Sequence, residues 1–217
     1  MSHSVAPPAT VAVFGATART GAPLLRRLLD AGYAVRAQAR TPDKLADAAR
    51  EGVTVVRGDF TDYESVAETL AGADAVVNLV GHVKGSPADL LRRGLANVAL
   101  AMEREGLRRV VSLSGAGVPY PGDEPKVADR AIRWVMRTFF ARMLADAVEG
   151  ANVLRASGLD YTLVRAPRLT DGEARGTVRE GYVGQVGTAI TRADLAEFLV
   201  GVLRDGRYVG DEPVASN

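Results

Sequence analysis

The fold is decided by one stretch near the N-terminus, VAVFGATARTG at residues 11–21. The apolar strand pattern VAVF is followed by the turn GATARTG, and leucines then recur at helical spacing. Gly15 has no side chain, so a phosphate can approach the backbone there, and the free amides at the start of the next helix favour an anion. Gly21 lets the helix pack closely against the strand. We expect this unit to bind a phosphate through Gly15, Thr17, Ala18, Arg19, Thr20 and Gly21.

Beyond this unit the chain keeps alternating between strand and helix patterns, which is the signature of a parallel sheet. The alternation favours a dinucleotide site over a tight turn without a ligand, although Ala18 stands where the usual fingerprint has its middle glycine. The sequence predicts an α/β fold, a Rossmann-type, doubly wound, mainly parallel sheet, in a single domain over residues 1–217 with substrate-side elements at about 115–150 and 166–190. Strands are expected at 10–14, 33–39, 53–57, 74–80, 108–113 and 160–165, and helices at 20–31, 42–50, 62–71, 87–105, 126–157 and 192–204.

Capping signals support several of these helix boundaries. Gly32 follows the first helical pattern and is expected to end it in a left-handed conformation. Asp62 and Ser86 precede later helical patterns and are expected to act as N-caps.

Composition narrows the class of protein. A hydrophobic fraction of 47% and a charged fraction of 24% are ordinary for a globular chain, and a net charge of +1 argues against a nucleic-acid partner. There is no cysteine, so thiolate sites and disulfides are excluded, and His3 and His82 alone give no metal site to expect. No secretory signal or long apolar run is present. We expect a cytoplasmic protein with a small-molecule substrate and no membrane partner.

The end of the second strand distinguishes between the two nicotinamide dinucleotides. An NAD-binding unit normally places an acidic residue there for the ribose hydroxyls, whereas this chain reads Ala37-Gln38-Ala39-Arg40. Arg40, Lys44 and Arg19 are expected to converge on a 2′-phosphate, although they could be solvated surface charges. The pattern favours NADP(H) as cofactor and keeps NAD(H) as the alternative.

The ordered set of motifs along the chain resembles the atypical short-chain dehydrogenase/reductases. It is most similar to their NAD(P)H-binding group, which includes NmrA-like proteins and the biliverdin-IXβ and flavin reductases. The resemblance runs from about Val11 to Val214. After the glycine turn it is carried by ARTPDKL, RGDFTD, VVNLVG, VVSLSGAG, SGLDYTLVRAPRLTDG and ITRADLAEFL.

The resemblance implies further cofactor contacts. Asp59 and Phe60 would flank the adenine ring, although Asp59 could simply cap a turn. Pro167, within Ala166-Pro167-Arg168, would lie near the nicotinamide ring. The loop beside the nicotinamide ribose would be formed by Leu79, Val80 and Gly81, which could equally be sheet core.

The catalytic pair usual in short-chain dehydrogenases is absent, because no tyrosine is followed four residues later by a lysine. Tyr161 and Arg165 have that spacing, but on a strand they would stand about 13 Å apart. The family's serine position falls near Ser114, which is the candidate catalytic residue, or else a hydroxyl that satisfies a strand-end amide. The cofactor itself carries hydride chemistry, so a reductase does not strictly need a protein acid.

The segment 126–157 carries an apolar stripe flanked by arginines, and it could be a lid over a substrate, a dimer face or core. The stripe consists of Ile132, Val135, Met136, Phe139, Phe140 and Met143, with Trp134 beside it. A homodimer is therefore left open.

The resemblance implies an NADP(H)-dependent oxidoreductase that reduces a small conjugated, quinone-like, flavin or tetrapyrrole acceptor. The alternatives are an NAD(P)-sensing regulator without turnover and a dinucleotide-dependent isomerase or epimerase.

Overall fold

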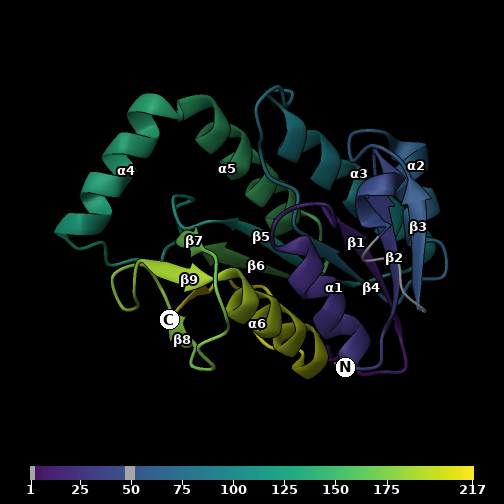
Figure 1. Cartoon of the computed structure of the whole chain (residues 1–217). Helices are drawn as coiled ribbons and strands as arrows, with labels where there is room; N and C mark the ends of the chain where they lie inside the picture. Colours follow the sequence, from purple (N-terminus) through teal and green to yellow (C-terminus); the bar gives the residue numbers. More distant parts are fainter. Residues whose placement is uncertain (1–2, 47–51) are drawn as a thin grey trace.

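A computed structural model of the chain describes residues 3–46 and 52–217 (Figure 1). Six parallel strands form the central sheet in the order β3-β2-β1-β4-β5-β6, so the predicted Rossmann-type fold is confirmed. The strand order reverses between β1 and β4, and ligands of such folds bind at that switch point. The strands are β1 (Thr10–Phe14), β2 (Ala34–Ala39), β3 (Val53–Arg57), β4 (Ala75–Asn78), β5 (Arg109–Gly115) and β6 (Asp160–Ala166).

Helices cover both faces of the sheet. Successive side chains of a strand point to opposite faces, so each strand contributes to two apolar cores. In β1, Val11 and Val13 belong to the core under α1 and α6, whereas Ala12 and Phe14 belong to the core under α2, α3 and α5. Both cores exclude water almost completely. These helices are α1 (Gly21–Asp30), α2 (Tyr63–Leu70), α3 (Leu90–Glu105), α5 (Ala141–Ala156) and α6 (Arg192–Asp205).

The capping predictions have mixed outcomes. Gly32 has the expected positive φ of 88° after α1, and the Asp62 side chain accepts a 3.1 Å hydrogen bond from the Ser65 amide at the start of α2. The prediction for Ser86 is wrong. Its hydroxyl accepts a hydrogen bond from the Val83 amide in a turn. Helix α3 begins only at Leu90, and a carboxylate from α5 accepts hydrogen bonds from the first amides of α3.

The predicted helix over 126–157 is in fact two helices, α4 (Val127–Phe139) and α5. Phe140, with φ −125° and ψ 26°, separates them, although no glycine or proline lies nearby. Helix α5 packs against α3, whereas α4 extends away from the sheet (Figure 1). The bend therefore reflects different tertiary packing of the two halves, which helical spacing does not reveal.

Other differences concern short elements. The predicted helix over 42–50 begins as a 3-10 turn, η1 (Pro42–Leu45), and residues 47–51 lie outside the described part of the chain. Within residues 3–46 and 52–217, no helix is long and apolar enough to cross a membrane. Four short strands complete the C-terminal part: β7 (Arg168–Thr170) pairs with β9 (Ala189–Thr191), and β8 (Arg179–Gly181) pairs with β10 (Val214–Ser216).

Candidate functional site

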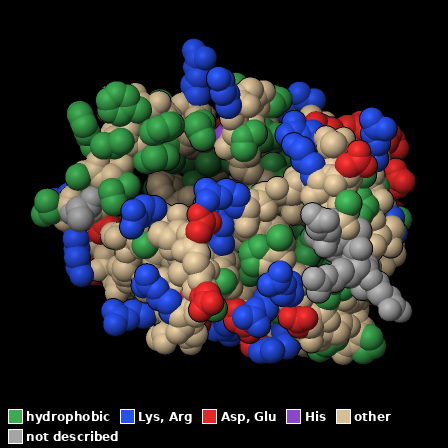
Figure 2. Space-filling model, in the orientation of Figure 1, with side chains coloured by type: hydrophobic (Ala, Val, Ile, Leu, Met, Phe, Trp, Pro, Cys, Tyr) green, Lys and Arg blue, Asp and Glu red, His purple; other side chains and the backbone are tan. Residues whose placement is uncertain are grey.

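Three neighbouring cavities share wall residues along the carboxyl ends of the strands. The polar cavity lies between the glycine turn and the ends of β2 and β3, with Arg40, Lys44 and Asp59 in its wall. The central cavity, of about 590 Å³, lies between the glycine turn, the end of β5 and helices α4 and α5. The outer cavity lies beyond it, between α4 and the segments after β6 and β8. Figure 2 shows a hollow on this face, with hydrophobic side chains gathered on its α4 and α5 side.

Backbone packing at the glycine turn explains its two glycines. Gly15 has φ 77°, and a Cβ there would lie 2.8 Å from the backbone of Leu79 and Val80. A Cβ on Gly21 would lie 1.8 Å from the carbonyl oxygen of Ala16, so this glycine lets α1 pack against the turn. The Thr20 side chain makes no capping hydrogen bond to the first amides of α1. The turn thus has the geometry of an anion cradle at a helix N-terminus.

The polar and central cavities bring together the residues expected to bind the cofactor, with one exception. Gly21 lies behind the turn and lines neither cavity. The roles of these residues remain predictions. The wall residues are Gly15, Thr17, Ala18, Arg19, Thr20, Arg40, Lys44, Asp59, Phe60, Leu79, Val80, Gly81 and Pro167.

Two of the three cations expected at a 2′-phosphate line the polar cavity, and the third lines the central cavity. Arg40 and Lys44 line the polar cavity, and neither forms an ion pair with a residue in the described part of the chain. Arg19 lines the central cavity instead and pairs with Asp171, which also accepts a 2.6 Å contact from Arg192. Asp171 follows β7, about 150 residues from the turn, so sequence proximity could not reveal this pairing.

Asp59 both caps a turn and lines the polar cavity. Its Oδ1 accepts hydrogen bonds from the amide and hydroxyl of Thr61, at 2.8 and 2.7 Å. Burial alone would raise the pKa of this carboxyl, but the Thr61 hydrogen bonds and the charges of Arg40 and Arg93 hold the pKa below its usual value. Asp59 is therefore anionic at neutral pH and can only accept hydrogen bonds from a ligand.

The adjoining wall residues are also part of the core. The Phe60 ring lies 5.3 Å from that of Phe14, and a Cβ on Gly94 of α3 would overlap it. Sequence reasoning missed Asn78 at the end of β4. Its side chain donates to the Ser112 hydroxyl at 2.9 Å and accepts from the Val80 amide at 3.0 Å, so it orients the loop after β4.

Ser114 lines the central cavity together with Pro167. Its hydroxyl neither donates a hydrogen bond to another described residue nor accepts one, which distinguishes it from the bonded and buried Ser112. Its alternative role, to satisfy a strand-end amide, is therefore not seen. None of the six tyrosines lines any of the three cavities, and Tyr182, for example, donates instead to Asp211 at 2.8 Å.

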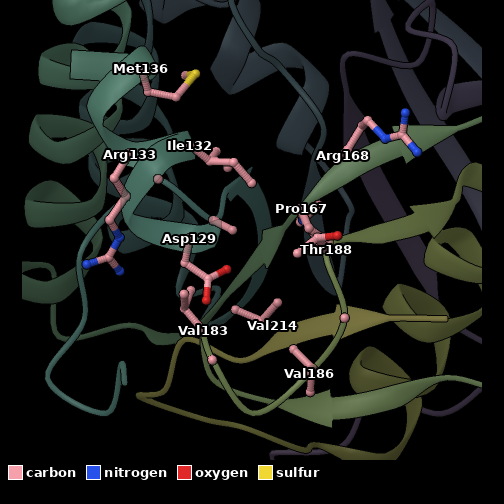
Figure 3. A pocket seen from close by; sticks show the side chains of 16 residues that line it. Asp129, Ile132, Arg133, Met136, Pro167, Arg168, Val183, Val186, Thr188 and Val214 are labelled. Atoms are coloured by element: carbon pink, nitrogen blue, oxygen red, sulfur yellow. The ribbon is translucent and has the colours of Figure 1, made fainter. Parts of the chain in front are cut away.

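The outer cavity is bordered by α4 on one side and by Pro167, Arg168 and Thr188 on the other (Figure 3). Ile132 and Met136 of α4 contribute to its wall. The apolar stripe expected at 126–157 is therefore divided between cavity walls and solvent. Val135, Phe139, Phe140 and Trp134 are exposed, which excludes a core role for this part of the stripe.

An ion cluster that sequence reasoning missed holds the outer cavity together. The Arg165 side chain has no exposed surface and donates to both carboxylate oxygens of Asp123, at 2.8 and 2.9 Å. Arg133 of α4 adds a 2.6 Å contact to the same carboxylate, and the Val183 amide donates to it at 3.3 Å. One buried aspartate thereby joins the loop after β5, helix α4, strand β6 and the loop after β8. The sequence showed only an arginine on a strand and an aspartate in a turn-rich loop.

A second buried pair was also missed. His82, in the loop after β4, lines the central cavity, and its Nε2 lies 2.7 Å from Oδ2 of Asp146 on α5. Asp146 also accepts hydrogen bonds from the amides of Leu91 and Arg92, at 2.7 and 3.1 Å, in the first turn of α3. No sequence motif connects the two residues, which stand 64 positions apart. Elsewhere in the described residues, no group of three or more acidic or histidine side chains could hold a metal ion.

Comparisons with known proteins agree with this geometry. Residues 15–206 match the model of a family described as NAD(P)H-binding. Cinnamoyl-CoA reductase 1 from Petunia hybrida is 30% identical over 136 residues, which cover 57% of this chain and 41% of that protein. The chain thus spans about two fifths of that relative's length. Reductase pytE from Aspergillus terreus is 27% identical, with 93% of this chain and 95% of that protein covered.

Solved structures share the fold over nearly the whole chain. ChuY, an anaerobillin reductase from Escherichia coli, has a TM-score of 0.79 at 21% identity, with 95% of this chain and 96% of that chain covered. A short-chain dehydrogenase/reductase from Veillonella parvula in complex with NADP has a TM-score of 0.78 at 18% identity, with 96% and 94% covered. At these identities the likeness establishes the fold alone.

Proposed function

The chain belongs to the NAD(P)H-binding family, and we propose that it is an NADP(H)-dependent reductase of a small conjugated acceptor such as a quinone, flavin or tetrapyrrole. One observation carries the proposal. The central cavity, of about 590 Å³, adjoins the glycine turn and is walled on its far side by α4 and α5. It offers room for an acceptor beside a dinucleotide bound at the turn.

The residues present fit such a dinucleotide. The cradle at Gly15 and the first amides of α1 suit a pyrophosphate. Arg40 and Lys44 suit a 2′-phosphate, because both are exposed cations without an ion pair to any described residue. Asp59 and Phe60 would lie against the adenine, and Pro167 near the nicotinamide. When bound, the reduced cofactor supplies a hydride.

Preference for NADP(H) rests on the end of β2. The strand ends at Ala39 and is followed by Arg40, so no carboxylate stands where an NAD-specific chain binds the ribose hydroxyls. Asp59, the acidic residue in the wall of the polar cavity, is already bonded to Thr61. Together, Arg40, Lys44 and the lack of an acidic residue at the end of β2 favour NADP(H).

The walls of the central cavity suit a flat, mainly apolar acceptor. Leu113, Met136, Met143, Leu144 and Ala147 supply apolar contacts from three elements. Methionine adapts its shape to different ligands, and apolar walls exclude water from a transferred hydride. The two arginines of the cavity share Asp171, so their charge is partly compensated.

A second function, an NAD(P)-sensing regulator without turnover, has one observation in its favour. The exposed apolar residues of α4, including Trp134 and Phe139, form a surface that a partner protein could cover. A regulator would bind NADPH and leave it unoxidised.

The test is to mix purified protein with NADPH and a panel of quinones, flavins, enones and linear tetrapyrroles, without oxygen. Loss of the reduced-nicotinamide absorbance is expected with at least one acceptor class. Ala147→Phe should fill the central cavity and abolish oxidation while NADPH binding is retained. Ala145→Phe, on the exposed side of the same helix, is the matched control and should leave both unchanged. Tight NADPH binding with no oxidation across the panel would favour the regulator.

A further inference from the structure

We propose that His82, held by Asp146, donates the proton that accompanies hydride transfer in the central cavity. The inference rests on the proposed reductase function and adds a catalytic site to it. It also specifies the acceptor class as a conjugated carbonyl or imine whose oxygen or nitrogen gains a proton.

The walls of the central cavity leave His82 as the proton source. In the part of the chain that the structure describes, its ionisable side chains are Arg19, Arg192 and His82. A guanidinium does not lose its proton in proteins, so the two arginines cannot act as acids. The hydroxyl of Ser114 is a weak acid that can orient an acceptor by a hydrogen bond. Imidazole is the side chain suited to proton donation near neutrality.

Asp146 is buried and surrounded by hydrogen-bond donors. Its side chain is only 3% exposed, and its carboxylate accepts two amide hydrogen bonds at the positive end of α3. The His82 side chain is 7% exposed and bonds to the same carboxylate. The carboxylate of Asp146 holds and orients the His82 ring, in the way that a carboxylate orients histidine in hydrolase triads.

The pairing also determines which ring nitrogen is available. A carboxylate only accepts hydrogen bonds, so Nε2 of His82 must carry the hydrogen directed at Asp146. Nδ1 has no hydrogen-bond partner among the residues described, and His82 is one of the residues that line the cavity together with Ser114 and Pro167. Nδ1 is therefore the atom that can exchange a proton with an acceptor.

Hydride and proton go to opposite ends of the conjugated acceptor. A bound reduced dinucleotide would supply the hydride, with two electrons, to an electrophilic carbon of the acceptor and would itself be oxidised. The Nδ1–H bond of His82 breaks, and its proton moves to the oxygen or nitrogen at the other end of the conjugated system. The neutral imidazole keeps its Nε2 hydrogen bond to Asp146 and regains a proton from solvent.

The decisive variant is His82→Gln, because a glutamine amide can still donate to Asp146 but cannot deliver a proton. The NADPH affinity and the free energy of unfolding should stay unchanged, while the rate of the hydride step falls by about one hundred to ten thousand times. Added imidazole should restore part of the rate. His3→Gln, at the other histidine, is the matched control and should be silent. Full turnover by His82→Gln would overturn this inference and leave the reductase function standing, whereas no turnover by the unmodified protein would overturn both.

A readout independent of activity is the nitrogen NMR spectrum of the imidazole rings in the protein without ligand. The neutral ring of His82 should carry its hydrogen on Nε2, and Asp146→Asn should remove that preference. His3→Gln assigns the signals. A His82 ring with its hydrogen on Nδ1 would contradict the proposed geometry, whatever the turnover.

Discussion

The polar cavity and the outer cavity lie at opposite ends of one row of cavities, and they are built in different ways. The polar cavity is formed by turns that directly follow β1 to β4, in the first 90 residues of the chain. The outer cavity is assembled from five separate segments between residues 115 and 214. Its parts are connected through the buried carboxylate of Asp123.

The two cavities should therefore respond differently to substitution. Arg40 and Lys44 are exposed at the polar cavity and have no ion pair with a described residue, so their removal should affect a ligand and not the fold. Asp123 and Arg165 are buried against each other, so removal of one leaves the other charge unpaired.

The largest effect is expected from Asp123→Ala. Arg165 has no exposed side-chain surface, so it would be left as a buried, uncompensated cation. We expect the free energy of unfolding to fall by about 3–5 kcal/mol, measured by urea denaturation. Asp171→Ala is the matched control, because that carboxylate is 61% exposed and its pairs contribute about 1 kcal/mol or less. Equal losses in the two variants would show that the buried pair of Asp123 and Arg165 contributes no more to stability than an exposed ion pair.

The same aspartate should contribute to acid sensitivity. Burial opposes ionisation of Asp123, but hydrogen bonds and charge from Arg165, with the amides of Tyr120 and Val183, hold its pKa below the usual value. A lowered folded pKa gives stability that is present above the unfolded pKa, about 3.9, and is lost as pH falls below it. Urea denaturation at neutral pH and at about pH 3 should therefore show a smaller decrease in the free energy of unfolding for Asp123→Asn than for the unmodified chain.

The second effect, smaller and on the ligand, is expected from Arg40→Ala. Loss of one charge-assisted contact should weaken NADPH binding by about 1.5–3 kcal/mol, or about 10- to 150-fold, while NADH binding stays the same. The measurement is calorimetric titration with both cofactors, with the free energy of unfolding expected to change by less than about 0.5 kcal/mol. Arg26→Ala, at an exposed arginine of α1 outside the three cavities, is the matched control. Equal weakening of NADPH and NADH would contradict the 2′-phosphate assignment.

The same contrast explains what the sequence could predict. The packing of Gly21 on Ala16, the cap at Asp62 and the left-handed Gly32 depend on neighbours within a few residues, and their residue types reveal them. The first amides of α3 bond to Asp146, 55 residues from Leu91, so no local pattern could show that Ser86 is not the cap.

Longer separations hid the rest of the site. Arg19 pairs with Asp171 across 152 positions, and Arg165 with Asp123 across 42. Strand and helix periodicity fixes which residues face the sheet, but it contains no information on which loops meet above the strand ends. Most residues that line the polar cavity could therefore be named from the sequence, and their roles stay predictions, whereas the walls of the outer cavity and the pair of His82 with Asp146 could not be named.

The smallest effect is expected within the acceptor side itself, at Trp134. This side chain is 64% exposed on α4 and lines none of the cavities, so Trp134→Ser should change the free energy of unfolding by less than about 0.5 kcal/mol. As the single tryptophan, Trp134 also reports on its own surroundings. Its fluorescence should be quenched readily by iodide at low protein concentration. Protection of Trp134 from iodide that grows with protein concentration would mean that a second copy of the chain covers α4. The exposed fraction of Trp134 in a single chain would then no longer indicate how much α4 contributes to stability.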